Sequence, residues 1–297
     1  MIKTPGAMMK SKAVLYVLCV FLFCFSVLPV LAEEEGHKDT SAGPSSGSSA
    51  ETLQSLDISL SSKEIIEKVD QRLRGKTSYQ EMEMTIYNPD WRGPRTYKMK
   101  AWEDVEAEKS FILITHPPRE RGKAFLKEGY VFKAYIPSRR ENKPMTIPPS
   151  LMLQPWMGSN FTRDDLVKES SIVHDYTHHF VSMDESDVGT LVHIRMEPKP
   201  DAPVVWGRID YWVKKDGFIP YKVRYYDDRG KAVREMTMTE VEEMDGREVP
   251  TRWEMESLEA EDMGKRTVLK IKEVDFNLKI DSSVFTEKNL TRRNRDW

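Results

Sequence analysis

Three histidines that lie close together in the sequence could bind a metal ion. His174 and His178 are four residues apart, so a helix would bring both imidazoles to one face, as helical zinc sites require. A zinc site needs three or four converging ligands, however, and residues 175–177 let the chain leave a helix before His178 and His179. We therefore predict histidines that are solvated or locally hydrogen-bonded, and we predict neither a metal ion nor a cofactor.

The common catalytic patterns are absent from the sequence. It contains no Gly-x-Ser-x-Gly turn, no Ser-x-x-Lys motif with its partner motifs and no glycine-rich phosphate loop. Its adjacent carboxylates, such as Asp164 and Asp165 or Glu242 and Glu243, lie at an expected helix start or near turns, where charge is common. We therefore predict that the protein is not an enzyme.

Apolar side chains point to a different chemistry, the binding of hydrocarbon. Residues 151–165, called here the central segment, are strongly apolar, lack the alternation of the neighbouring strands and are hinged by Pro155 and Gly158. Such a segment needs an apolar surface to lie against. It either plugs the core of a β structure or covers a cavity that holds an apolar ligand.

Methionines and aromatic residues in strands and in the central segment are the candidates for lining such a cavity. Methionine is flexible and polarizable, which suits it to irregular apolar ligands. The alternative for each residue is an ordinary packed core, where these residue types are also common. The candidate ligand-binding residues are Met82, Met84, Ile86, Met99, Trp102, Phe111, Phe132, Leu153, Trp156, Met157, Phe161 and Tyr211.

Residues 1–32 have the pattern of a secretory signal peptide. Three lysines flank an apolar stretch over 13–30, and small residues end it at Ala32. We expect export with cleavage near Ala32. The alternative is an uncleaved membrane anchor, because about 18 apolar residues can span a bilayer.

Both cysteines lie within this first segment. Neither Cys19 nor Cys24 follows a small residue, as a lipoprotein signal requires, so we expect that the protein is not a lipoprotein and that the mature chain has no disulfide. Cleavage would also remove three lysines and change the net charge from −3 to about −6. This acidic balance gives no indication of a nucleic-acid partner.

Composition and periodicity divide the rest of the chain. Residues 33–60 are rich in Ser, Gly and Glu and are expected to form a flexible linker. Residues 61–290 suit a single domain and 291–297 a tail. A helix is expected over 61–75, with a serine cap, Gly75 as its stop and an apolar stripe that includes Ile65 and Val69.

From Tyr79 onward the apolar period is two, which predicts strands. Asp-Gly and similar turns join the later ones near 206–215, 218–227, 231–243, 247–259 and 266–278. A second short helix is expected over 162–169. The predicted fold is mainly β with two or more helices: a strongly curved antiparallel sheet or half-open barrel of about 11 strands with a helical lid. Which face of each strand points inward is a choice of parity that the sequence leaves open.

The block Ser150-Leu-Met-Leu-Gln-Pro-Trp-Met-Gly-Ser-Asn-Phe-Thr-Arg-Asp-Asp-Leu-Val-Lys-Glu169 resembles one branch of the LolA-like family of periplasmic outer-membrane lipoprotein-sorting proteins. A hairpin pattern near 209–231 is also similar to that family. The resemblance implies a half-open barrel closed by helices and a cavity that shields acyl chains of lipoproteins, or another lipid, in transit across the envelope.

The same resemblance implies further roles. An arginine on the early strands would hold the lid, and Arg92 and Arg95 lie in the corresponding part of this chain, although no motif selects either one. The partners would be lipid or lipoprotein acyl chains, with an inner-membrane transporter as donor or an outer-membrane protein as acceptor. The alternative function is an envelope scaffold that docks a membrane transporter or other partner protein without carrying cargo.

Overall fold

A computed structural model describes residues 59–292 except 138–142, 169–170 and 203. The predictions for the signal peptide, nearly all of the linker and most of the tail therefore lie outside the described residues. Within them, no helix combines the length and the apolar character needed to cross a membrane.

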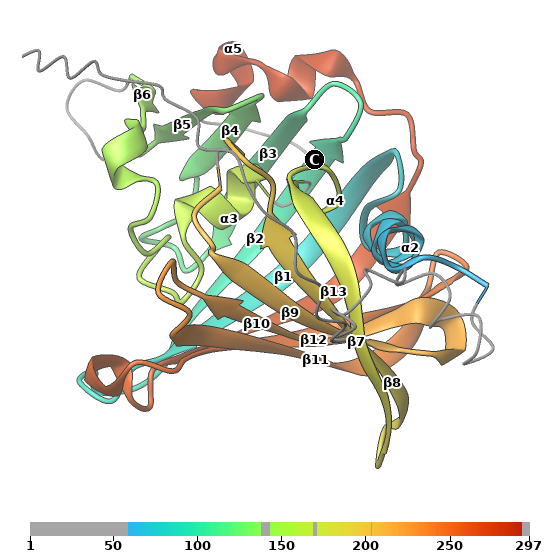
Figure 1. Ribbon diagram of the computed structural model, residues 1–297. Helices are drawn as coiled ribbons and strands as arrows, with labels where there is room; N and C mark the ends of the chain where they lie inside the picture. The colour runs from blue at the N-terminus through green and yellow to red at the C-terminus, as the bar shows by residue number, and fades with distance from the viewer. Residues whose placement is uncertain (1–58, 138–142, 169–170, 203, 293–297) are drawn as a thin grey trace, which may run out of the picture. The chain divides into compact units, whose positions relative to one another are not determined.

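The described chain forms one antiparallel sheet, which curves strongly (Figure 1). Its strands are β1 (Thr77–Tyr87), β2 (Arg95–Asp104), β3 (Lys109–His116), β4 (Ala124–Glu128), β5 (Val131–Tyr135), β6 (Met145–Thr146), β7 (Tyr176–Ser186), β8 (Gly189–Pro198), β9 (Arg208–Lys214), β10 (Ile219–Tyr226), β11 (Ala232–Met244), β12 (Arg247–Ser257) and β13 (Arg266–Phe276). The curved antiparallel sheet is confirmed, with 13 strands rather than about 11. One strand that the alternation could not reveal is β6, because it has only two residues.

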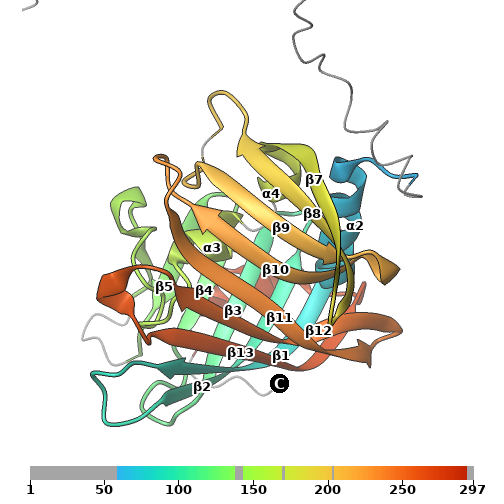
Figure 2. The same cartoon turned by 60° about the horizontal axis from the view of Figure 1, so that its bottom comes forward.

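The order of the strands explains where the central segment must lie. Across the sheet the order is β6-β5-β4-β3-β2-β1-β13-β12-β11-β10-β9-β8-β7. The chain therefore builds outward from β1 to one edge, crosses to the opposite edge at β7, and returns strand by strand until β13 pairs with β1. The connection between the two edge strands contains the central segment, and its helix α3 lies on the inner side of the curve (Figures 1 and 2).

Helix α2 (Ser62–Arg74) confirms the predicted first helix. Ser61 and Glu64 form a reciprocal capping box, and Gly75 follows the helix with a positive φ of 65°. Ile65, Ile66 and Val69 are completely buried against the inner face of the sheet. Fully burying such side chains stabilises the fold by roughly 1.5–3 kcal/mol each, so tertiary packing holds this helix in place.

Short helical elements complete the structure. The predicted helix over 162–169 is α3 (Arg163–Lys168), followed by α4 (Ser171–His174). The central segment begins with the 3-10 turn η1 (Pro149–Leu151), and the turns η2 (Asp216–Phe218) and η3 (Ala260–Asp262) lie between later strands. The C-terminal elements η4 (Ser282–Phe285) and α5 (Glu287–Leu290) cover the outer face of β3 and β4.

A buried carboxylate ties three strands together on the outer face. Asp210 of β9 is only 2% exposed, and Arg195 Nε of β8 donates to its Oδ1 over 3.0 Å. Arg208 Nε and His193 Nε2 lie 3.7 and 3.6 Å from its oxygens. Burial alone would raise the pKa of Asp210, but the hydrogen bonds from His193, Arg195 and Tyr226 hold that pKa well below its usual range.

We predict that Asp210→Asn lowers the free energy of unfolding by about 2 kcal/mol at pH 7, because it removes the buried charge that accepts hydrogen bonds from the partly exposed side chain of Arg195 and its neighbours. A carboxyl with a lowered pKa stabilises the folded state above its ordinary pKa of about 3.9, and this stabilisation is lost as the pH falls through the lowered value. The difference between variant and wild type should therefore shrink in strong acid. Urea unfolding at pH 7 and pH 3 measures it, and a difference under about 0.5 kcal/mol at pH 7 would contradict this role.

Candidate functional site

A cavity of about 240 Å³ lies between α2, the inner face of the sheet and the central segment. A single water molecule needs only roughly 10–15 Å³ of such space, so the cavity is far larger than a packing defect. Its wall is mostly apolar, and methionines contribute to it from β1, β2, β8, β11 and β12: Met82, Met84, Met99, Met196, Met236, Met238 and Met255.

Seven of the twelve candidate binding residues border this cavity. Two groups come together there, one from the sheet and one from the central segment. They are Met82, Met84, Met99, Trp102 and Tyr211 on strands, and Trp156 and Phe161 on the segment. Apolar residues of β1 and β2 and Trp156 of the central segment thus border the same space.

The other five candidates do not line the cavity. Ile86 and Phe132 are buried in the cluster around Met84 and Trp156, behind the cavity wall. Met157 packs against the same cluster, whereas Leu153 is 53% exposed. Phe111 lies in the cluster on the outer face with Val284 and Phe285.

Trp102 and Phe111 show how strand parity decides these outcomes. Trp102 pairs with Phe111 across β2 and β3, so both side chains take the same face, and their rings lie 5.9 Å apart. The ring of Trp102 also packs 5.2 Å from that of Tyr79. The inner face carries the residues of opposite parity, such as Met99 and Ala101 on β2, because side chains alternate along a strand. The inward assignment of Phe111 was therefore wrong, and Trp102 only borders the cavity.

The central segment folds into a tight turn between η1 and α3. Trp156 N donates to Phe161 O over 2.7 Å, and the Ser159 hydroxyl donates to Trp156 O over 2.7 Å. Met157 and Gly158 have positive φ values of 56° and 82°, which lets the chain reverse here. This turn places Trp156 against Phe125 of β4, with the two rings edge to face at 5.4 Å.

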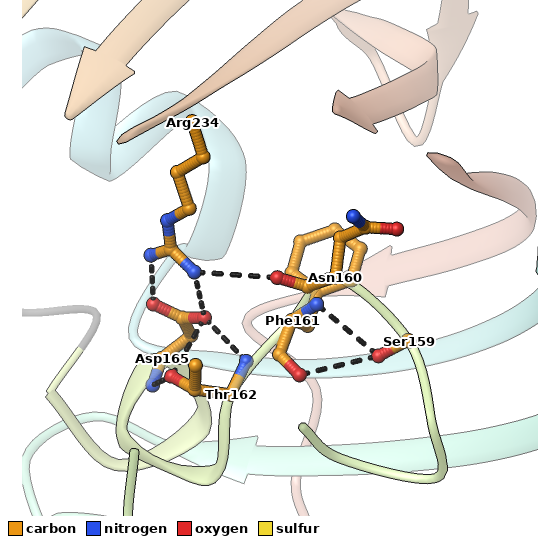
Figure 3. Close-up of polar contacts among 6 residues, drawn as sticks. All are labelled: Ser159, Asn160, Phe161, Thr162, Asp165 and Arg234. Carbon is orange, nitrogen blue, oxygen red and sulfur yellow. Dashed lines mark hydrogen bonds and ion pairs between the residues drawn. The ribbon is translucent and has the colours of Figure 1, made fainter. Parts of the chain in front are cut away.

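Arg234 of β11 fixes the far end of this turn to the sheet (Figure 3). Its Nη1 donates to Asp165 Oδ2 over 2.8 Å and to Asn160 O over 3.4 Å, and its Nη2 also bonds Asp165. The guanidinium carbon lies 4.3 Å from the Trp206 ring and 4.4 Å from the Tyr225 ring. Burial lowers the pKa of Arg234, but Asp165 more than offsets this, so the side chain stays charged.

Asn160 makes a second attachment, to β13. Its backbone N–H donates to the Thr267 hydroxyl over 2.9 Å, and that hydroxyl donates to Asn160 Oδ1 over 2.8 Å. Thr267 is completely buried, so these bonds form in a place that water reaches poorly. Two polar attachments therefore join an apolar cover to the sheet, one to β11 and one to β13.

The resemblance pointed to the early strands for an arginine that holds the lid, and no motif selected Arg92 or Arg95 for this role. Arg95 stacks on Trp91, 3.6 Å from the ring centroid, whereas Arg234 is the arginine that contacts the central segment. The alternation of side chains along β11 gave one sign of this role. Arg234 lies on the same strand face as Met236 and Met238, so it is a charged residue in an otherwise apolar row. Its partner, Asp165, could not be identified from spacing, since 69 residues separate them.

The three neighbouring histidines take separate places. His174 ends α4 and His178 and His179 lie in β7, so no single helix carries them. His178 Nε2 lies 2.8 Å from Ile172 O, and His179 Nε2 lies 3.2 Å from the Thr177 hydroxyl. Burial lowers the pKa of His178, which favours its neutral form. Over residues 59–292, apart from the three gaps, no group of three His, Cys, Asp or Glu side chains could hold a metal ion.

Comparisons with known proteins establish the fold. A family model described as an uncharacterized protein matches residues 106–292, which is more than half of the chain. No curated protein matches. Among solved structures, a DUF1329 family protein from Desulfovibrio piger is 20% identical over 77% of this chain and 97% of its own, with a TM-score of 0.68.

Two further solved structures share this fold. A domain assigned to outer membrane lipoprotein sorting in Vibrio parahaemolyticus is 20% identical over 78% of this chain and 98% of its own, with a TM-score of 0.66. A LolA superfamily protein from Nitrosomonas europaea is 20% identical over 77% of this chain and 99% of its own, with a TM-score of 0.64. The chain thus has a LolA-like fold, as its apolar block and curved sheet predicted.

We predict that Asp165→Asn loosens the central segment while the sheet stays folded. Hydrogen bonds to charged groups contribute roughly 1.5–3 kcal/mol each, so hydrogen exchange at Trp156 and Asp164 should accelerate at least about tenfold. Glu235→Gln is the matched control, since Glu235 pairs with Arg224 on the outer face next to Arg234. Equal exchange in both variants and the wild type would show that the Arg234 contact does not hold the segment.

Proposed function

This chain belongs to the family of uncharacterized proteins whose model matches residues 106–292, and we propose that it is a periplasmic carrier of lipid. The hydrocarbon part of the cargo, such as the acyl chains of a lipoprotein, occupies the cavity below the central segment during transfer across the envelope. The observation that carries the proposal is the cavity itself, with its wall of methionines and aromatic residues and its polar-bonded cover.

The energetics of hydrocarbon in water support a carrier. Removing one methylene group from water is favourable by about 0.8 kcal/mol, so moving a chain of sixteen carbons from an apolar site into water costs roughly 12 kcal/mol. A protein that moves such a chain must bury most of it and later release it. Flexible methionine side chains can fit a hydrocarbon chain of variable path, and an opening of the Arg234–Asp165 contact provides an exit.

The location and the class of the protein are parts of the same proposal. Residues 1–32 carry the signal-peptide pattern, and the LolA-like fold is shared with a domain assigned to outer membrane lipoprotein sorting. The cavity wall joins apolar residues to a few carboxylates and one arginine, a composition suited to binding rather than to turnover. We therefore assign a binding function and no catalytic step.

The scaffold alternative has one observation in its favour. Leu151 and Leu153 of the central segment are 44% and 53% exposed, although they belong to the most apolar block of the domain. A partner protein such as a membrane transporter could dock on them. In the carrier account the same leucines contact the donor or acceptor of the cargo, so exposure alone does not favour a scaffold.

We predict that protein purified from an exporting host without detergent retains lipid at a near-stoichiometric level. Ala101 borders the cavity, and Ala101→Phe places a ring in that space, so retained lipid should fall about tenfold or more while the thermal midpoint is preserved. Ala107→Phe is the control, because Ala107 is exposed in the turn between β2 and β3. Organic extraction and mass spectrometry measure the lipid.

The same measurement separates the two functions. Lipid lost in Ala101→Phe and kept in Ala107→Phe supports the carrier. A lipid-free wild type that co-purifies with a stable partner, and loses it when Leu151 and Leu153 become serine, supports the scaffold. Equal lipid in both alanine variants would show that the lipid binds outside the cavity.

A further inference from the structure

One end of the cavity is polar, whereas the wall beyond it is mostly apolar. Ser78, Glu103, Ser110 and Lys127 occupy paired positions on β1, β2, β3 and β4, and they form a row across the inner face, called here the polar row. Ser78, Glu103 and Ser110 border the cavity. The next row along the strands, Gln80, Ala101, Ile112 and Phe125, is already mainly apolar, and the row after that contains Met82 and Met99.

Helix α2 adds a buried ion-pair network above the polar row. Arg74 is 5% exposed, and its Nε lies 3.2 Å from Asp70 Oδ1 while its Nη1 donates to Glu103 Oε1 over 3.1 Å. Asp70, Arg74 and Glu103 all border the cavity. Lys127 is 7% exposed and acts electrostatically on Glu103. Two carboxyls and Arg74 thus meet at one end of the cavity, with Lys127 next to Glu103, while the other charged lining residues, Asp164 and Asp165, belong to the central segment.

An apolar ligand alone would not need this end of the cavity. Buried charged groups cost stability unless they are paired, and replacing such networks by apolar residues is often neutral or stabilising. The rows are about 7 Å apart, because strands rise roughly 3.4 Å per residue. The methionine row is the second row from the polar row, so a ligand that follows the sheet passes over about 14 Å from the methionines to the polar row, which is the profile of an amphiphile.

Resting on the proposed function, we propose that this polar end is a subsite for the uncharged, hydroxyl-bearing head of an amphiphilic lipid. Asp70 and Glu103 already face Arg74, so an anionic head would meet two carboxyls. A cationic head would meet Arg74 and Lys127. Hydroxyl groups both donate and accept, and they match carboxyl oxygens, serine hydroxyls and guanidinium N–H groups together.

The burial of Glu103 and Asp70 also favours an uncharged head. Burial raises the pKa of Glu103 and of Asp70, although Arg74 opposes the change in both. A carboxyl in such a setting is a poor neighbour for a further negative charge. In either protonation state it forms a hydrogen bond with a hydroxyl group, since the ionised form accepts and the protonated form donates.

The test compares three ligands with the same sixteen-carbon chain and different heads: monopalmitoylglycerol, palmitate and hexadecyltrimethylammonium. Isothermal titration calorimetry at pH 8, with each ligand below its critical micelle concentration, gives the three dissociation constants. The wild type should bind monopalmitoylglycerol about tenfold or more tighter than either ion. In Glu103→Gln, which removes one negative charge beside Arg74, the preference should shift about tenfold toward palmitate.

Two further variants keep the test decisive. Glu83→Gln makes the same change on the outer face of β1 and should leave the ratio of affinities unchanged. Ser110→Ala should weaken the binding of monopalmitoylglycerol about fivefold, since a typical hydrogen bond contributes about 1 kcal/mol, and should leave the binding of palmitate unchanged. If Glu103→Gln does not fold, Ser110→Ala alone tests the subsite.

The outcomes separate the head-group assignment from the carrier proposal. Equal affinities for the three ligands, a wild-type preference for either ion, or a ratio that neither Glu103→Gln nor Ser110→Ala changes would overturn the subsite while the cavity still binds chains. Absence of binding for all three ligands would overturn the carrier as well.

Discussion

The structure depends on one constraint, the twist of a single antiparallel sheet of 13 strands. A sheet of this size curls because each strand is rotated relative to its neighbour, and the curve encloses more space than a 13-residue helix and a few short turns can fill. Strand order adds the cover. Because β6 and β7 are the opposite edges, the chain between them must cross from one edge to the other, and its apolar residues lie over the enclosed space. A cavity under the central segment follows from the topology.

Different side chains form the wall of that cavity and attach its cover. Methionines from both halves of the sheet form a deformable wall, while Arg234, Asp165, Asn160 and Thr267 attach the cover through polar contacts. Polar contacts that are largely buried are strong but geometrically demanding, so a small displacement of α3 weakens several of them together. This arrangement suits a cover that is closed at rest and opens as a unit.

Local patterns predicted much of the fold, and long-range pairing decided the rest. The capped helix at 62–74 and the hairpins after Arg208 followed from caps, turns and alternation, which act over a few residues. The face of β2 that points inward, and therefore the different places of Met99 and Phe111, depends on register, which a shift of one residue reverses. Arg234 was missed for a related reason: it meets Asp165 only after β11 and the central segment are brought together by the whole sheet.

The most direct test of the central claim observes the methionine methyl groups while a hydrocarbon chain binds. Selective methyl labelling gives at most one signal for each of the 16 methionines. With a nitroxide near the end of a glycerol-linked alkyl chain, the account predicts paramagnetic broadening of Met82, Met99, Met236 and Met255, which border the cavity, and none of Met263, which is 76% exposed. Sharp signals from all four cavity methionines at saturating ligand, or broadening confined to exposed methionines, would contradict a chain-binding cavity.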